Sequence, residues 1–399
     1  MSDVPHLRFP EFSGEWKETT LGKIAEITKG SGISKDQLSE QGSPCILYGE
    51  LYTKYKSEII NEVYSRTELD SSPLVKSKAN DVIIPCSGET AIDISTARCV
   101  LFNNILLGGD LNIIRLKYDD GGFFAYQLNG ARKKDIARVA QGVSVVHLYG
   151  ENLKQIRVYY PNIEEQRKIT HLLSLIDGRI ATQNKIIDKL KSLIKGLNDS
   201  LYAQYGDDVL TSFSSLGLSY SGLSGKSAQD FGSGKPYITY LNVYSNNIIN
   251  EKDFQYVAIK EGEKQNVVEY GDVLFTLSSE TPEEVGIGSV YLGNENVYLN
   301  SFCFGIHIIN TKIAFPPYLS YYVSSTPFRK FIYPYAQGST RFNLCKADFE
   351  KASIKLPSLE NQKRIYSILS HIESKTETEK SLLDLYNSQK QYLLRQMFI

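Results

Sequence analysis

The sequence has little of several residue types that mark particular protein classes. Its 399 residues include one tryptophan, two methionines and five cysteines. The cysteines, Cys45, Cys86, Cys99, Cys303 and Cys345, are odd in number, scattered and without a Cys-x-x-Cys pair. This pattern disfavours both a disulfide framework and a zinc site. We interpret the cysteines as buried thiols.

Long hydrophobic runs and a strong net charge are also missing. No run approaches the roughly 18 apolar residues of a membrane span, and the first six residues show no basic region followed by an apolar core. We therefore expect a cytoplasmic protein with no membrane partner. The formal net charge is −1, so any binding to nucleic acid depends on local basic patches.

Complete catalytic motifs are missing as well. The segment Phe315-Pro316-Pro317-Tyr318 resembles the Asp/Asn-Pro-Pro-Tyr motif of amino-methyltransferases, but phenylalanine cannot accept a hydrogen bond from the target amino group. The segment Ser224-Gly225-Lys226-Ser227 resembles a phosphate loop, but Tyr220 stands where the leading glycine is needed. We interpret the first as a turn before a helix and the second as a polar loop.

Other candidates for chemistry are isolated. The five histidines are far apart, and Asp110, Asp272 and Glu280 have no evident partner in the sequence. Gly30-Ser31-Gly32 lacks the third glycine of a dinucleotide-binding fingerprint. We identify no catalytic residue and no metal ligand, and predict that the chain is not itself an enzyme and holds no cofactor.

The clearest positive feature is a long amphipathic pattern over residues 164–204. Apolar or seam residues recur about every 3.56 positions from Ile169 to Leu201, a spacing between the coiled-coil and straight-helix periods. Asn162 and the acids that follow it form a helix start after Pro161. About 41 residues at ~1.5 Å each predict a helix on the order of 60 Å long, too long to pack within one compact domain.

This pattern occurs twice. Shifted by 196 residues, residues 140–203 align with residues 336–399 without a gap. Ala-Gln-Gly at 140–142 matches 336–338, Pro161 matches Pro357, and Gln166 matches Gln362. An ungapped match of this length indicates duplication. The expected helix-pairing residues are Ile169, Leu172, Ile176, Ile187, Leu190 and Leu197 in the first helix and Ile365, Ile372, Leu383 and Leu393 in the second.

The segments before the helices also repeat, with more drift. Short apolar runs separated by turn residues predict strands between residues 42 and 116, and residues 123–139 look helical. The sequence predicts an α+β protein with domains at 1–160 and 206–356 and long helices at 161–205 and 357–399. The second helix differs by placing polar Thr376, Glu379 and Lys390 on its seam.

Several motifs carry a family resemblance over essentially the whole chain. They are Leu7-Arg8-Phe9-Pro10-Glu11-Phe12 with Trp16 and Leu21-Gly22, the repeated Ala-Gln-Gly, Pro161-x-x-Glu164-x-Gln166-Arg167-Lys168-Ile169, and Pro357-x-x-Glu360-x-Gln362-Lys363-Arg364-Ile365. Together they resemble the specificity subunit of type I restriction-modification systems. The repeated Pro-x-x-Glu-x-Gln start of a long helix is the most specific of them.

The resemblance implies two target recognition domains that each read one half of an asymmetric two-part DNA sequence. The long helices would pair as an antiparallel coiled coil that fixes the gap. Two methyltransferase subunits would dock on this frame, bind S-adenosylmethionine and methylate adenine at N6 after base flipping. Restriction and translocase subunits would add cleavage driven by ATP, with Mg²⁺ also bound on the partner subunits.

Double-stranded DNA would then be contacted by polar loops and basic helix ends. The candidates in the first half are Lys29, Ser31, Tyr52, Lys54, Ser87, Glu89, Thr90, Arg132, Lys133, Gln141 and Gly142. The candidates in the second half are Tyr240, Asn242, Tyr244, Ser278, Glu280, Thr281, Arg329, Lys330, Gln337, Gly338, Ser339 and Arg341. Ordinary solvation is the competing interpretation for the polar loops and for the basic helix ends. For the repeated Gln-Gly segments, the alternative is a role in the fold, which is to turn the chain into its last strand.

Two other functions remain open at this point. The chain could be a coiled-coil scaffold whose duplicated domains bind proteins instead of DNA. A solitary methyltransferase or nuclease is disfavoured by the incomplete motifs.

Overall fold

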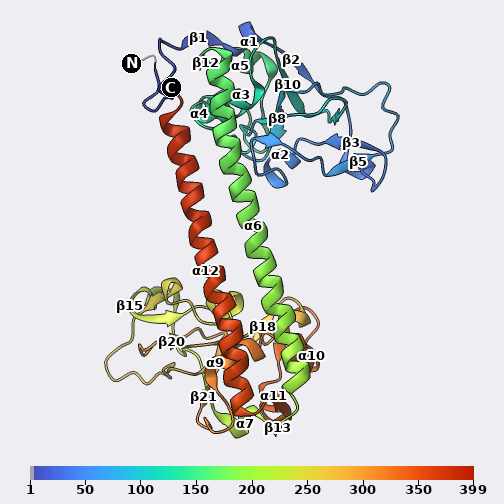
Figure 1. Cartoon of the computed structure of the whole chain (residues 1–399). Coiled ribbons are helices and arrows are strands. Elements are labelled where there is room, and N and C mark those ends of the chain that lie inside the picture. Colours follow the sequence, from blue (N-terminus) through green and yellow to red (C-terminus); the bar gives the residue numbers. More distant parts are fainter. Residues whose placement is uncertain (1–3) are drawn as a thin grey trace. The chain divides into compact units, whose positions relative to one another are not determined.

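The computed structural model describes residues 4–399, which divide into two compact units. Unit 1 contains the chain up to Lys185 together with Lys380–Ile399, and unit 2 contains Ile186–Glu379. Each unit holds one globular part and a segment of both long helices, α6 (Ile163–Tyr205) and α12 (Leu359–Gln396), drawn in green and red in Figure 1. No helix within residues 4–399 is long and apolar enough to cross a membrane.

The main sheet of unit 1 has five strands in the order β2-β10-β6-β8-β4. Their bounds are β2 (Ala25–Lys29), β4 (Ile59–Ile60), β6 (Asp81–Pro85), β8 (Arg98–Val100) and β10 (Leu111–Leu116). Alternate side chains of β6 enter different cores, because Val82 and Ile84 pack in one cluster and Ile83 in another. The sheet is therefore covered on both faces, as its continuous apolar strands require.

The remaining elements of unit 1 surround this sheet. A second sheet has the order β5-β3-β9, with β3 (Ser43–Ile46), β5 (Ser65–Thr67) and β9 (Leu106–Leu107). The terminal pair is β1 (Lys17–Thr20) with β12 (Arg157–Tyr160), and the short pair is β7 (Ser87–Gly88) with β11 (Val146–His147). The helices are α1 (Leu21–Ile24), α2 (Glu50–Thr53), α3 (Gly121–Asn129), α4 (Lys133–Val139) and α5 (Gly150–Lys154).

Unit 2 repeats this plan. Its sheets have the orders β14-β21-β17-β19, β16-β15-β20, β18-β23-β22 and β13-β24. The strands are β13 (Val209–Thr211), β14 (Gly217–Ser221), β15 (Phe231–Ile238), β16 (Gln255–Val257), β17 (Val273–Thr276), β18 (Ser278–Ser279), β19 (Gly288–Val290), β20 (Tyr298–Leu299), β21 (Cys303–Ile308), β22 (Ala336–Gln337), β23 (Phe342–Leu344) and β24 (Ile354–Leu356). The short helices are α7 (Phe213–Leu216), α8 (Tyr240–Ser245), α9 (Pro316–Tyr322), α10 (Thr326–Ile332) and α11 (Lys346–Lys351).

Both long helices begin with the same buried glutamine. The Gln166 amide donates to the Pro161 carbonyl at 2.9 Å and accepts from the Asp120 N–H at 2.9 Å. The Gln362 amide donates to the Pro357 carbonyl at 2.8 Å and accepts from the Phe315 N–H at 2.7 Å. The glutamine of the Pro-x-x-Glu-x-Gln motif thus ties the first turn of each helix to its own globular part, and this explains its recurrence.

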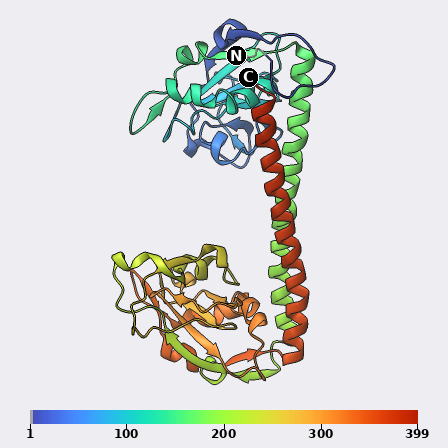
Figure 2. The same ribbon diagram turned by 90° about the vertical axis from the view of Figure 1, so that its left-hand side faces the viewer.

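The two long helices run antiparallel where they share a unit. In unit 1, Lys390 of α12 pairs with Asp177 of α6, and Tyr386 of α12 lies against Arg179 of α6. Moving forward along α6 therefore means moving backward along α12. Figure 2 shows the same pairing from another side, with the globular part of unit 1 on one side of the helices.

The residues expected to pair the helices differ in burial. Ile169, Ile176, Ile187, Ile365 and Leu393 are buried, and Leu172, Leu190, Leu197, Ile372 and Leu383 are partly exposed. Two residues outside that set, Leu173 and Leu369, are fully buried because the helices also pack on the globular parts. The set of residues expected from helix pairing alone therefore leaves out residues that pack on the globular parts.

Three expectations about local structure need correction. The helix expected over 123–139 is broken into α3 and α4, because Gly130 leaves the helical conformation at the end of α3. The sequence of residues 16–28 does not distinguish a strand from a short helix, and the structure contains both there, as β1, α1 and β2. Asp272 does have partners, since its carboxylate accepts from Tyr220 Oη at 2.6 Å and lies 2.8 Å from His307 Nδ1.

Candidate functional site

The structure joins two sequence motifs of each unit into one small ladder of strands. In unit 1, Ser87 of β7 lies opposite His147 of β11, and Gln141 bridges to the other side of His147. In unit 2, Ser278 of β18 lies opposite Asn343 of β23, and Gln337 of β22 lies on the other side. We call these arrangements ladder 1 and ladder 2.

Each ladder ends in a tight turn that needs its glycine. Gly142 has a φ of 116° and Gly338 a φ of 146°, both in the left-handed region. A Cβ at Gly142 would lie 2.1 Å from the carbonyl oxygen of Val145, and one at Gly338 would lie 2.1 Å from that of Arg341. The repeated Gln-Gly therefore shapes the turn and presents the side chains that follow it.

The turns present different side chains in the two units. The tip of ladder 1 carries Val143, which is 98% exposed, and Val145. The tip of ladder 2 carries exposed Ser339 and Arg341, whose guanidinium lies 5.9 Å from the ring centre of exposed Phe302. The same backbone turn thus exposes apolar side chains in unit 1 and side chains that donate hydrogen bonds in unit 2.

The acidic loop after the first strand of each ladder is also exposed. Glu89 and Thr90 follow β7, and Thr90 Oγ1 donates to Asp93 at 2.6 Å. Glu280 and Thr281 follow β18 at the corresponding place. Tyr240 of α8 donates to the Ser278 carbonyl at 2.8 Å, so it flanks ladder 2.

Other predicted contact residues are held inside the fold. Asn242 is buried and exchanges hydrogen bonds with the backbone of Asn250. Arg329 donates to three carbonyls, those of Gly286, Glu283 and Val285, at 2.7–2.8 Å, and burial lowers its pKa. The polar groups of both side chains are therefore bonded within the fold, and neither side chain is free to bind an outside partner.

Further candidates in unit 1 also make hydrogen bonds or ion pairs within the fold. Ser31 Oγ accepts from the Val75 N–H at 2.8 Å, and Lys54 donates to Glu50 at 2.6 Å. Arg132 pairs with Asp135 at 3.2 Å and lies over the Tyr159 ring. We interpret these residues as parts of the scaffold.

The candidates that remain accessible lie at several places. Lys29 is exposed at the end of β2, and Lys330 is exposed on α10. Lys133, at the start of α4, and Tyr52 of α2 are half-buried and line one cavity of unit 1. Tyr244 donates to Glu284 at 2.7 Å, and this contact raises its pKa.

Sequence reasoning missed several exposed residues of the ladders. They are Val143, Val145 and His147 in ladder 1 and Asn343 in ladder 2. The signal in the sequence that could have identified them is their position, because each follows a Gln-Gly motif within a few residues. Within residues 4–399, no three His, Cys, Asp or Glu side chains come together as metal ligands would.

Comparisons with known proteins agree with this two-part organisation. A family model described as the type I restriction modification DNA specificity domain matches residues 13–192 and 223–385. The fold is similar to that of the S subunit of a type I restriction-modification system from M. genitalium, with a TM-score of 0.60 and 16% identity over 99% of both chains. A chain from a structural study of complex assembly and conformational transition in the type I R-M system has a TM-score of 0.58 at 16% identity, over 95% of this chain and 96% of that one.

Proposed function

The chain belongs to the family of type I restriction-modification DNA specificity proteins and is a DNA specificity subunit, and from this premise we propose that each unit reads one half of a two-part DNA target. The observation that carries the proposal is that the family model matches twice, once within each half of the chain. A protein-binding scaffold offers no reason for two DNA specificity segments, so that alternative is not favoured.

The two ladders are our candidates for the surfaces that read bases. Arg341 can form a bidentate contact with the major-groove edge of guanine, while apolar groups such as Val143 can contact a thymine methyl group. Because the two tips differ in chemistry, the two half-sites should differ in sequence. We therefore propose an asymmetric target.

Phosphate binding would position these readers. Lys330 is exposed on α10, and Lys133 is accessible at the start of α4. Arg132 and Arg329 are occupied within the fold, so we assign the positioning role to the lysines alone. Lysine contacts to phosphate add affinity for any sequence.

We further propose that the long helices fix the gap between the half-sites. α6 has 43 residues, and a continuous helix of that size is about 64 Å long. Half-sites read from one face of DNA lie about 34–36 Å apart per helical turn, so such a helix is long enough to set a spacing. Inserting one helical turn in both helices should lengthen the gap.

The chemistry would come from partner subunits in the cytoplasm. We propose that two methyltransferase subunits dock on this chain and bring S-adenosylmethionine. Restriction and translocase subunits would bring ATP and Mg²⁺. In this proposal the chain supplies recognition and no catalytic group.

Methylation mapping tests the proposal directly. The chain would be co-expressed with a partner methyltransferase subunit, and N6-methyladenine would be mapped by single-molecule sequencing. We expect one asymmetric motif in two blocks with a constant gap, and replacing residues 16–150 should change one block only. A palindromic motif would contradict the asymmetric reading, and a complex without any motif would favour the scaffold.

A further inference from the structure

A basic cavity lies in unit 1, and neither Val143 nor Val145 of the tip of ladder 1 lines it. Its volume is about 1020 Å³, and its walls come from α2, the loop between α3 and α4, and the last turns of α12. Seven lysine or arginine side chains line it, against two carboxylate side chains, Glu58 and Asp93, and Arg132 also donates to an oxygen of Ile399, which lines the cavity. The cavity therefore carries an excess of positive charge.

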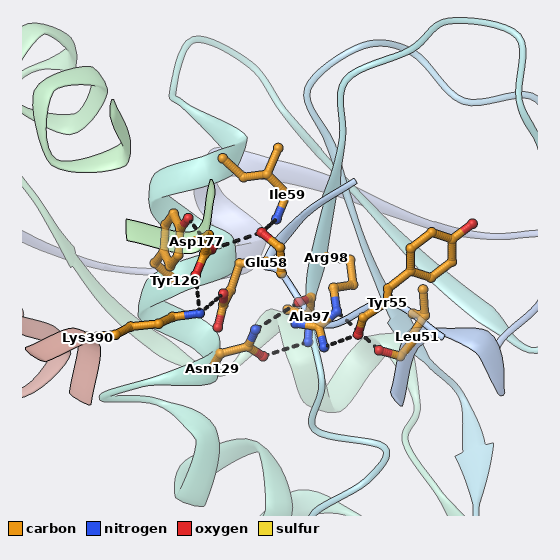
Figure 3. A network of polar contacts seen from close by, with 11 residues as sticks. Leu51, Tyr55, Glu58, Ile59, Ala97, Arg98, Tyr126, Asn129, Asp177 and Lys390 are labelled. Carbon is orange, nitrogen blue, oxygen red and sulfur yellow. Dashed lines mark hydrogen bonds and ion pairs between the residues drawn. The ribbon is translucent and has the colours of Figure 1, made fainter. Parts of the chain in front are cut away.

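Only part of this charge is neutralised inside the protein. Lys390 Nζ lies 2.5 Å from Glu58 Oε2 and 2.6 Å from Asp177 Oδ1, as Figure 3 shows. Glu58, one of the carboxylate side chains that line the cavity, is therefore already paired with Lys390. Arg98 and Lys133 have no carboxylate within ion-pair distance among residues 4–399.

Arg98 is the most deeply placed of these cations. Its side chain is 7% exposed and donates to two neutral carbonyls, those of Leu51 at 3.1 Å and Tyr55 at 2.8 Å. These contacts orient the guanidinium without neutralising it (Figure 3). Burial lowers the pKa of Arg98, because the charge has lost water and gained no carboxylate contact.

Lys133 shares this condition, whereas Arg132 pairs with Asp135 at 3.2 Å. Burial lowers the pKa of Lys133, and the positive charge of Arg98 lowers it further. Arg132 Nε is buried without a hydrogen-bond partner. An anion in the cavity would relieve the repulsion between Arg98 and Lys133.

We propose that this cavity binds a phosphate group, held by Lys133 with Arg98 at its floor. Guanidinium and ammonium groups are the side chains that bind phosphate most strongly, and a cavity of this size accepts a phosphorylated ligand. The group could belong to a free phosphorylated molecule or to the backbone of DNA. The binding itself does not depend on the proposed reading of bases.

Unit 2 provides a contrast within the same chain. Val82 of β6 pairs with Cys99 as Val273 of β17 pairs with Val290, so Ser289 occupies the place of Arg98. The Cys99 N–H donates to the Glu58 carbonyl as the Val290 N–H donates to that of Asn247. The deep guanidinium is therefore a feature of unit 1, and unit 2 should not bind the same group.

Titration of the full chain with pyrophosphate by calorimetry tests the proposal. We expect one pyrophosphate per chain and at least tenfold weaker binding for Lys133→Ala. The same loss is expected for Lys56→Ala, because Lys56 is another lysine that lines the cavity. Lys312→Ala removes an exposed lysine of unit 2 that does not line the cavity, and this variant should bind as the wild type does. Thermal unfolding of each variant shows whether it remains folded. Arg98→Ser introduces the residue that unit 2 has at this place. If that variant does not fold, Arg98→Lys, which keeps the buried charge, takes its place in the titration.

The source of the phosphate follows from a second titration with a duplex of random sequence. If the duplex displaces pyrophosphate and Lys133→Ala weakens both, the cavity holds the DNA backbone. If pyrophosphate and duplex bind together, the cavity holds a free phosphorylated ligand. Absence of pyrophosphate binding, or equal binding by folded Lys133→Ala, would overturn the proposal.

Discussion

Units 1 and 2 share one plan of strands but stabilise their helix contacts with different chemistry. In unit 1, the carboxylate of Asp177 accepts from Tyr126 Oη at 2.7 Å and pairs with Lys390. In unit 2, the matching carboxylate of Glu373 accepts from Tyr321 Oη. Ile194, 196 residues before Lys390, stands where the lysine would be. A tyrosine–carboxylate contact is therefore common to both units, and the buried cation belongs to unit 1.

The comparison shows what a duplicated fold can change. A buried ion pair contributes little net stability compared with apolar packing, but it becomes costly when one partner is lost. Lys390, Glu58 and Asp177 therefore have to be replaced together. Lys390, one of the polar seam residues of the second helix, thus forms an ionic contact with Glu58 of the globular part of unit 1 and with Asp177 of α6.

Lys390→Ile gives unit 1 the residue of unit 2 and has the largest expected effect. It leaves Glu58 and Asp177 buried without their cation, and such a change costs about 3–5 kcal/mol. Hydrogen exchange of unit 1 amides measures the loss, with unit 2 amides as the internal reference. Adding Glu58→Asn and Asp177→Glu completes the set of unit 2 and should restore most of the stability. A triple variant as unstable as the single one would refute this account.

A second difference lies in the main sheets. Asp81 is held by two bonds from Arg115 at 2.7 and 2.8 Å, while Asp272 at the matching place has both His307 and Tyr220. Arg115→Ala should cost about 2–3 kcal/mol, because Asp81 loses its charged partner. His307→Ala should cost about 1 kcal/mol, because the Tyr220 bond remains. Denaturant unfolding of the two variants measures the difference, and equal losses would contradict it.

The buried glutamines should show the opposite result, with equal effects in both units. Replacing Gln166 or Gln362 by methionine keeps the size but leaves backbone groups without partners, at about 1–3 kcal/mol. Hydrogen exchange at the first turns of α6 and α12 measures each loss. A large effect in one unit alone would mean that the two helix starts are similar in sequence but that the glutamine does not stabilise both of them.

Arg341→Ala tests the difference between the ladder tips. If Arg341 reads a base, its loss should relax the preference at one position of one half-site by about 1–3 kcal/mol. Methylation mapping of the assembled complex measures the preference, and Ser339→Ala is the control on the same turn. Loss of methylation at all sites alike would point to assembly in place of base reading.

The smallest effect is expected from Lys330, which follows Arg329 on α10. Lys330→Ala should weaken binding to every DNA sequence and lower the salt slope by about one. Arg329→Ala should instead destabilise unit 2, because three backbone carbonyls lose their donor. Binding titrations at several salt concentrations, with thermal unfolding beside them, separate the two roles. An unchanged slope for Lys330→Ala would remove it from the DNA contacts.

The sequence by itself determined the repeat, the two long helices, the mixed α and β content and the family. These features depend on periodicity and on motifs within a short stretch, such as Pro161 with Gln166, whose geometry the local chain sets. The turn glycines Gly142 and Gly338 belong to the same class, because a left-handed φ is a local demand.

Tertiary structure alone decided which polar residues are free. Asn242 and Arg329 are polar in sequence, yet both are held by hydrogen bonds to backbone groups elsewhere in the fold. Val143, in contrast, is apolar and exposed. Ladder 1 joins residues about 60 positions apart, and Lys390 meets Glu58 across 332 residues. No local pattern specifies such pairings, because they form only when the sheet and both helices have assembled.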